Sequence, residues 1–118
     1  MNIARTIEIC AAAIDAAYAQ ARAIQYPDKF ATEAPFVPPD RVRTRLEWAN
    51  NKSDAIGFVY EMRTRASELV PLNTIERFAL EYAFEILRVR ILAEAIDESV
   101  IEIARAQTAE FAAKRRKK

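Results

Sequence analysis

The sequence has no histidine, a single glycine (Gly57) and a single cysteine (Cys10) among its 118 residues. Without histidine, the chain lacks the commonest general base and the commonest transition-metal ligand, and a Ser-His-Asp or Cys-His catalytic arrangement is impossible. One glycine cannot build a glycine-rich phosphate loop. A lone cysteine excludes an internal disulfide and is typical of a reducing compartment. These absences exclude most enzyme classes, so we expect a protein that is not an enzyme and uses no cofactor or metal.

Long hydrophobic runs are also missing. No uncharged apolar stretch approaches the roughly eighteen residues that a membrane span needs, and the first nine residues lack the basic and then apolar order of a signal peptide. We therefore expect no membrane partner, no secretion by a signal peptide, and a cytoplasmic or virion location. With 52% apolar and 30% charged residues, the chain is expected to form one globular domain over residues 1–118.

The net charge of +1 hides an uneven distribution of charge. The last five residues are all basic, and the rest of the chain holds thirteen basic and seventeen acidic residues. This tail is a candidate contact for an anionic partner, either nucleic acid or the acidic face of another subunit. The alternative is a solubilising end that complements the negative C-terminus of a helix. The tail residues are Lys114, Arg115, Arg116, Lys117 and Lys118.

Hydrophobic spacing and helix breakers predict an all-α helical bundle. Residues 2–25 are rich in alanine and have an apolar seam at alternating spacings of four and three, as in a packed bundle helix or a short coiled coil. Residues 26–40 hold four of the five prolines and are expected to form an extended arm, which packs on its own chain or on a neighbour. Shorter helices are predicted at 41–50, with Asp40 as the N-cap, and at 54–69.

No glycine or proline occurs after Pro71, so residues 74–115 are predicted to form one long C-terminal helix. A helix of about forty residues would extend roughly 60 Å, whereas a compact domain of this size has a diameter of about 35 Å. Such a helix would need a partner outside its own chain, most simply another copy. An alternative stays open, because Ser99 and Glu102 form a capping-box pattern that would divide the helix near Asp97.

The long helix has a heptad-like apolar series that we interpret as an oligomer interface, joined by the seam of the first helix. Its proposed interface residues are Ile75, Tyr82, Ile86, Val89, Ile96, Val100 and Ile103. A second cluster, in the segment DRVRTRLEW, places Arg41 and Arg45 on one helix face. These two arginines are candidates for contact with an anion or a partner, or for local ion pairs. Trp48 is expected to cover the core.

Carboxylates of the C-terminal segment are the remaining candidates for chemistry. Glu94-Ala95-Ile96-Asp97 resembles the ExxD motif of all-helical nucleotide pyrophosphatases of the MazG type, and that resemblance would imply Mg²⁺-dependent hydrolysis. The accompanying ExxE motif is not found in the chain. We therefore interpret these carboxylates as a solvated acidic face with arginine partners.

Taken as a sequence, the chain predicts a non-enzymatic structural or adaptor subunit of a symmetric homo-oligomer, in contact with other protein subunits. A component of a bacteriophage virion, similar to a head–tail connector, is one candidate by analogy of architecture. The alternative is a small helical binding module that regulates or inhibits a protein or nucleic-acid partner.

Overall fold

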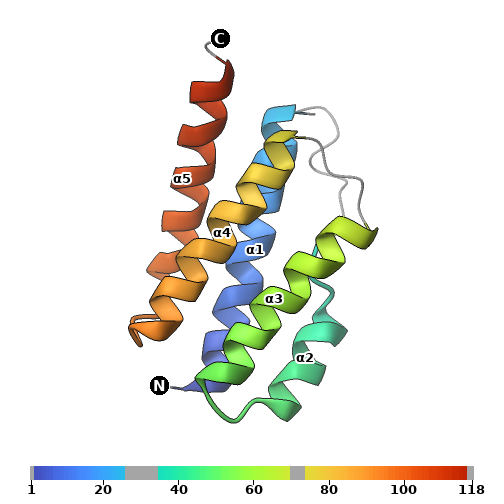
Figure 1. Cartoon of the computed structure of the whole chain (residues 1–118), viewed down its shortest axis with the longest axis vertical. Coiled ribbons are helices and arrows are strands. Elements are labelled where there is room, and N and C mark those ends of the chain that lie inside the picture. The colour runs from blue at the N-terminus through green and yellow to red at the C-terminus, as the bar shows by residue number, and fades with distance from the viewer. Residues whose placement is uncertain (1, 26–34, 70–73, 117–118) are drawn as a thin grey trace.

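The computed structural model describes residues 2–25, 35–69 and 74–116, and these residues form an all-α bundle (Figure 1). The predicted fold class is therefore confirmed. Most of the predicted proline-rich arm, residues 26–34, lies outside the described residues. The helices of the described part are α1 (Ile3–Gln25), α2 (Pro39–Trp48), α3 (Lys52–Leu69), α4 (Thr74–Leu92) and α5 (Ser99–Arg116).

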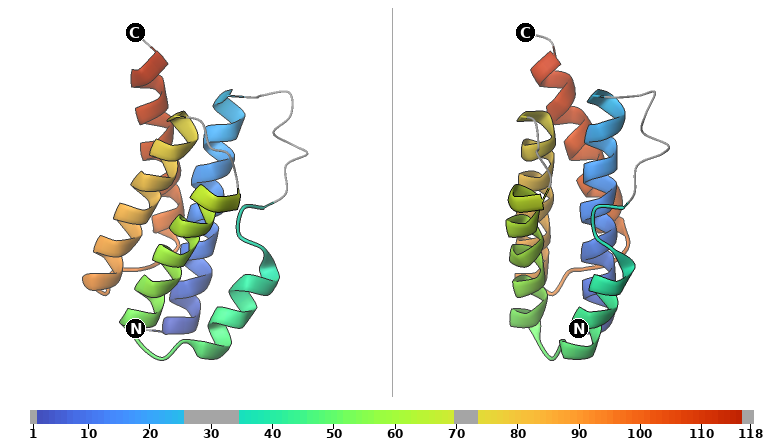
Figure 2. Two further views of the ribbon diagram at one scale, coloured as in Figure 1. Left: turned by 45° about the vertical axis from the view of Figure 1, so that its right-hand side comes forward. Right: turned by 90° about the vertical axis from the view of Figure 1, so that its right-hand side faces the viewer.

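The helices run alternately up and down the bundle from α2 to α5, while α1 runs parallel to α3 and α5 (Figure 1). Seen from the side, α3 and α4 form one layer and α1 and α2 lie in the other (Figure 2). Helix α1 contacts all four other helices, and α4 packs against both α3 and α5. The start of α1 and the end of α5 consequently lie at opposite ends of the bundle (Figure 1).

Helix α1 is central because its seam combines isoleucines with small residues. Ile7 and Ile14 are fully buried, and so are Cys10, Ala17 and Ala21. Alanines allow a neighbouring helix to approach closely, and α1 packs against α5, whose small residues Ala104 and Thr108 are buried. The seam is thus the core of a bundle rather than an oligomer interface, which agrees with the simpler of the two sequence interpretations.

The start of α2 differs from the prediction by two residues. The helix begins at Pro39, with Pro38 in extended conformation at the N-cap position, because proline lacks the N–H that would remain unbonded in the first turn. Asp40 therefore lies inside the first turn rather than at the cap. The segment before it is attached to α1, since the Val37 N–H donates a 2.7 Å hydrogen bond to Asp15 Oδ1 and the Val37 side chain is buried.

The predicted single helix over 74–115 is wrong, and the open alternative of a break near Asp97 is correct. Helix α4 ends in a Schellman motif, in which the Ala95 N–H bonds to the Arg90 carbonyl (2.9 Å) and the Glu94 N–H to the Ile91 carbonyl (3.1 Å). Glu94 occupies the left-handed position of the motif, with φ 55°. Glycine is the usual residue there, so the sequence carried no obvious stop signal.

Helix α5 starts directly after this turn. The side chain of Asp97 accepts a 2.9 Å hydrogen bond from the Ser99 N–H and a second bond from the Ser99 hydroxyl, as an N-cap residue does. The chain thereby reverses direction, and α5 lies antiparallel to α4 (Figure 1). The longest dimension of the molecule is 43 Å, shorter than the continuous helix would have been. Among the described residues, no helix has the length and apolar character to cross a membrane.

Comparing the free energies of unfolding of Glu94→Ala and Glu94→Gly tests this turn. In the left-handed conformation, Glu94→Gly should be more stable than Glu94→Ala by about 1 kcal/mol, because alanine pays for its Cβ there. In a continuous helix the order would reverse by a similar amount. Urea denaturation of both variants measures the difference, and neither variant retains the Lys52 ion pair. At position 102, inside α5, the alanine variant should be more stable than the glycine variant, as in any helix. If alanine is also the more stable residue at position 94, the turn is disproved.

Candidate functional site

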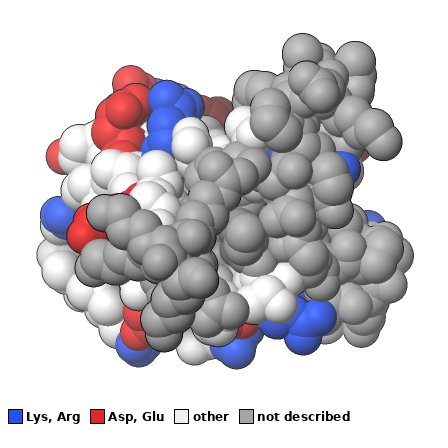
Figure 3. Space-filling view, turned by 90° about the horizontal axis from the view of Figure 1, so that it is seen from above, with Lys and Arg blue, Asp and Glu red and all other residues white. Residues whose placement is uncertain are grey.

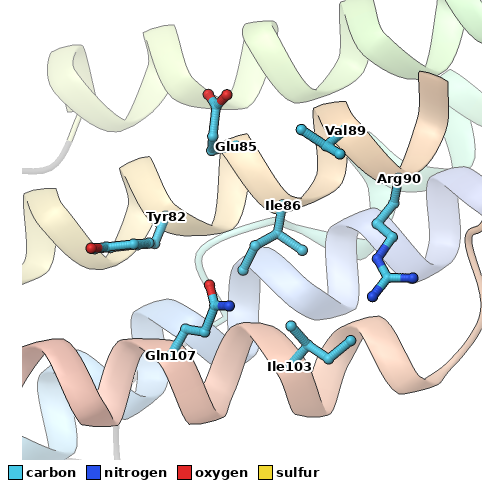
Figure 4. Close-up of a pocket in the computed structure, with 7 residues that line it drawn as sticks. All are labelled: Tyr82, Glu85, Ile86, Val89, Arg90, Ile103 and Gln107. Carbon is cyan, nitrogen blue, oxygen red and sulfur yellow. The ribbon is translucent and has the colours of Figure 1, made fainter. Parts of the chain in front are cut away.

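An apolar groove lies between α4 and α5, with a volume of about 300 Å³. Ile86 and Arg90 extend from α4 toward α5, and Ile103 and Gln107 extend from α5 toward α4 (Figure 4). Its lining residues are Tyr82, Glu85, Ile86, Val89, Arg90, Ile103 and Gln107. The antiparallel hairpin creates the groove, because it places the α4 segment beside the α5 segment.

The groove continues onto an exposed apolar stripe along α4. Large apolar side chains on this stripe retain much of their exposure: Phe78 37%, Tyr82 39%, Val89 51% and Leu92 54%. Their spacings of four, seven and three residues place them on one helix face, where the exposed Glu85 lies between Tyr82 and Val89. The opposite face of α4, with Leu80, Leu87 and Ile91, is fully or almost fully buried in the core. Helix α4 is therefore apolar on both sides, as expected of a helix that packs against neighbours on both. We call the four exposed residues Phe78, Tyr82, Val89 and Leu92 the α4 stripe.

Four of the seven predicted interface residues meet at this groove. Tyr82, Ile86, Val89 and Ile103 all line it, although the prediction assumed one continuous helix. Val100 was placed wrongly: it is fully buried in the core, because the chain reversal turns the first turn of α5 toward the interior. Ile96 is half-buried in the turn and packs against the core.

The last predicted interface residue, Ile75, has a side chain outside the described part. The predicted interface also left out five residues of this surface: Phe78 and Leu92 of the α4 stripe, and Glu85, Arg90 and Gln107 of the groove. A helical projection of 74–92 alone would have put Phe78 and Leu92 beside Tyr82 and Val89.

The predicted anion contacts Arg41 and Arg45 have an internal role. Both lie close to Glu61 of α3 and form ion pairs with it, Arg45 Nε at 3.8 Å from Oε2. The Arg45 guanidinium also donates a 2.5 Å hydrogen bond to the Asp54 carbonyl. These contacts attach α2 to α3, so the structure supports the alternative of local ion pairs.

The basic tail cannot be placed in the same way. The side chains of Lys114, Arg115 and Arg116, and all of residues 117–118, lie outside the described part. On the described part of that end of the bundle, acidic and basic side chains lie next to one another rather than gathering by sign (Figure 3). The tail as a partner contact stays a prediction.

Each candidate catalytic carboxylate near the turn has a structural partner. Glu94 forms a 2.9 Å ion pair with Lys52, and this contact lowers the pKa of the Glu94 carboxyl. Hydrogen bonds from Ser99 lower the pKa of Asp97. Because Glu94 and Asp97 sit in a turn and not on one helix face, the resemblance to a helical ExxD motif is not supported. In the residues that the structure describes, no three His, Cys, Asp or Glu side chains form a group that could hold a metal ion.

The buried Cys10 thiol and the half-buried Asp15 carboxyl, both on α1, have shifted pKa values. Burial raises the pKa of the Cys10 thiol to about 12, so at neutral pH it is not a nucleophilic thiolate. Burial also raises the pKa of Asp15 to about 6, against the opposing effect of hydrogen bonds from the backbone of Val37 and Phe36. Neither group borders the groove.

Trp48 does not cover the core, contrary to the prediction. Its side chain is 68% exposed at the C-terminal end of α2, because the helix ends there and the chain turns toward α3. It lies away from the lining of the groove and provides an exposed apolar residue for comparison with Val89.

No family model, curated protein or solved structure matches this chain. The case for a function therefore depends on the groove and the α4 stripe, whose apolar surface is suited to binding another protein surface.

Proposed function

We propose that this protein is a non-enzymatic structural or adaptor subunit that self-associates through the α4–α5 groove and the α4 stripe. The observation that carries the proposal is the exposure of Val89 and Leu92, each more than half exposed, next to an apolar groove. Contiguous apolar surface on a small domain marks interaction sites more often than chance. Burying one such side chain gains about 1.5–3 kcal/mol.

The proposal does not extend to a virion. The analogy with a head–tail connector depended on a helix of about 60 Å that needed outside support. Two antiparallel helices of 19 and 18 residues replace it, and they support each other. Self-association is now favoured by the exposed apolar residues of the α4 stripe, and no longer by the length of a predicted helix.

Substituting Val89 tests the proposal. Static light scattering of the unaltered protein, at low and at high salt, should give a molar mass above that of one chain, because apolar contacts resist salt. Val89→Glu should give the mass of one chain with unchanged helical circular dichroism, because the new carboxylate would be buried in the interface without a partner.

Trp48→Glu is the matched control, since it removes a still more exposed apolar side chain from another face. It should leave the oligomer intact. A monomer for the unaltered protein at both salt concentrations, or an oligomer that persists in Val89→Glu, would reject the proposal. The monomer result would favour the alternative of a binding module for a different protein.

A further inference from the structure

Helix α2 differs from the other helices in how little of it is buried. Each of the other four contributes fully buried side chains to the core, such as Ile14, Phe58, Leu87 and Val100, whereas none of the ten residues of α2 is buried. Figure 1 shows α2 at the edge of the bundle. Ordering a residue costs conformational entropy, and burial of apolar side chains is the main gain that offsets this cost. The core therefore stabilises α2 less than it stabilises the other helices.

The segment that leads into α2 is anchored on α1. We call residues 36–38 the strap. Within it, the Val37 side chain is buried, and the Val37 N–H donates its 2.7 Å hydrogen bond to Asp15. The Phe36 ring packs on the Tyr18 ring of α1, with 5.1 Å between the centroids. Prolines 38 and 39 join the strap to α2 with restricted backbone angles, so the strap and the helix are expected to move together. The side chains of α2 that pack against the core are half-buried, and they are Val42 and Leu46.

Two arginines link α2 to α3. Arg41 and Arg45 form ion pairs with Glu61, and the Arg45 guanidinium donates a hydrogen bond to the Asp54 carbonyl. These contacts are made by the ends of long side chains. They can be broken without removing any residue of α3 from the core.

The connection after α2 provides a point about which the helix can turn. Ala49 has extended backbone at the C-cap position, with φ −75° and ψ 124°. The next residue already belongs to the start of α3, because the Asn50 N–H donates a 2.5 Å hydrogen bond to Asp54 Oδ2. A rotation at Ala49 would therefore move α2 and leave the first turn of α3 in place.

We propose that the strap and α2, residues 36–48, form a lid that opens as one unit while α1, α3, α4 and α5 keep their packed core. Opening would break the hydrogen bond to Asp15 and the ion pairs to Glu61 together. It would uncover apolar side chains that now pack in or against the core: Phe36, Val37, Val42 and Leu46. No residue of the α4–α5 groove or the α4 stripe belongs to the lid, so this inference does not depend on the proposed self-association.

Amide hydrogen exchange, resolved by residue with NMR, tests the lid. In the unaltered protein the amides of α2 should exchange at least about tenfold faster than the core amides of α4, because opening the lid requires less free energy than unfolding the chain. Low concentrations of urea should accelerate exchange in α2 less than in α4, because opening the lid exposes less surface.

Two mild substitutions separate the lid from the core. Ile91→Val weakens the core of the closed and the open form alike, so it should accelerate exchange in α4 by about 2- to 12-fold and leave α2 unchanged. Val37→Ala weakens only the closed form. It should therefore accelerate exchange in α2 and α4 by the same factor, and the effect should extend to the last turn of α2.

Three results would overturn the proposal. Similar exchange rates in α2 and α4 of the unaltered protein, with the same dependence on urea, would show that α2 unfolds only with the whole chain. Equal acceleration of α2 and α4 in Ile91→Val would show the same. If Val37→Ala leaves the last turn of α2 unchanged, the helix frays independently of the strap and the two are not one unit.

Discussion

Val100→Glu should leave the chain unfolded at 25 °C, whereas Val89→Glu should remain a folded helical protein. The two valines occupy the same predicted seam, eleven residues apart, and a single long helix would treat them alike. In the folded hairpin Val100 is fully buried and Val89 is 51% exposed. The contrast between these two variants thus depends on the chain reversal at Glu94.

The expected difference in stability is large because position 100 is buried in the core, whereas position 89 is exposed to solvent. A carboxylate buried without a partner costs several kcal/mol, and a small domain has only about 5–15 kcal/mol of total stability. At position 89 the new side chain would reach solvent in the monomer, so its effect on folding should be within about 0.5 kcal/mol. Far-ultraviolet circular dichroism and urea denaturation measure both effects.

A milder pair keeps the comparison quantitative if Val100→Glu yields no soluble protein. Val100→Thr preserves the shape and buries a hydroxyl, which should cost about 1–3 kcal/mol of unfolding free energy. Val89→Thr exposes the same hydroxyl to water and should cost less than about 0.5 kcal/mol. Equal losses in the two threonine variants would show that both valines share one environment, and the hairpin would then be wrong.

Much of the fold could be predicted from the sequence because the segments of α1 and α3 have the apolar periodicity and the end signals that are typical of helices. The apolar seam of residues 2–25 is the core, and the ends of α2 lie within two residues of the prediction. The chain reversal was harder, because its left-handed residue is Glu94 and its neighbours Ala93 and Ala95 are strong helix formers. Tertiary packing decides the conformation there: folding back buries Val100 and Ala104 against the rest of the bundle.

The candidate site was partly predictable for the same reason. Tyr82, Ile86 and Val89 lie within one uninterrupted helix, so their periodicity places them on one face whatever follows. Ile103 lies beside them only because the chain reverses. The prediction grouped it with them correctly, but on the assumption of one continuous helix. Arg41 and Arg45 were ambiguous, since a sequence shows charges on one helix face but not the Glu61 side chain that another helix brings to them.

Removing the charge of Glu61 should cost about 1–3 kcal/mol of unfolding free energy, more than any other single ion pair described above. Glu61 lies between the two guanidinium groups of Arg41 and Arg45, and all three side chains are at least two-thirds buried. The Nε–H groups of both arginines are buried and donate no hydrogen bond to any atom of the described part of the chain. Glu61→Gln would keep the shape but leave two half-buried cations facing a neutral amide.

Urea denaturation of Glu61→Gln measures this cost, and Glu102→Gln provides the matched control. Glu102 pairs with Arg105 at 3.6 Å on the surface of α5, so its loss should change stability by less than about 0.5 kcal/mol. A double-mutant cycle of Glu61→Gln with Arg41→Met separates the pair from the individual side chains. If Glu61→Gln costs no more than Glu102→Gln, the two arginines do not depend on Glu61. Their assignment to an external anion, as the sequence allowed, would then regain its support.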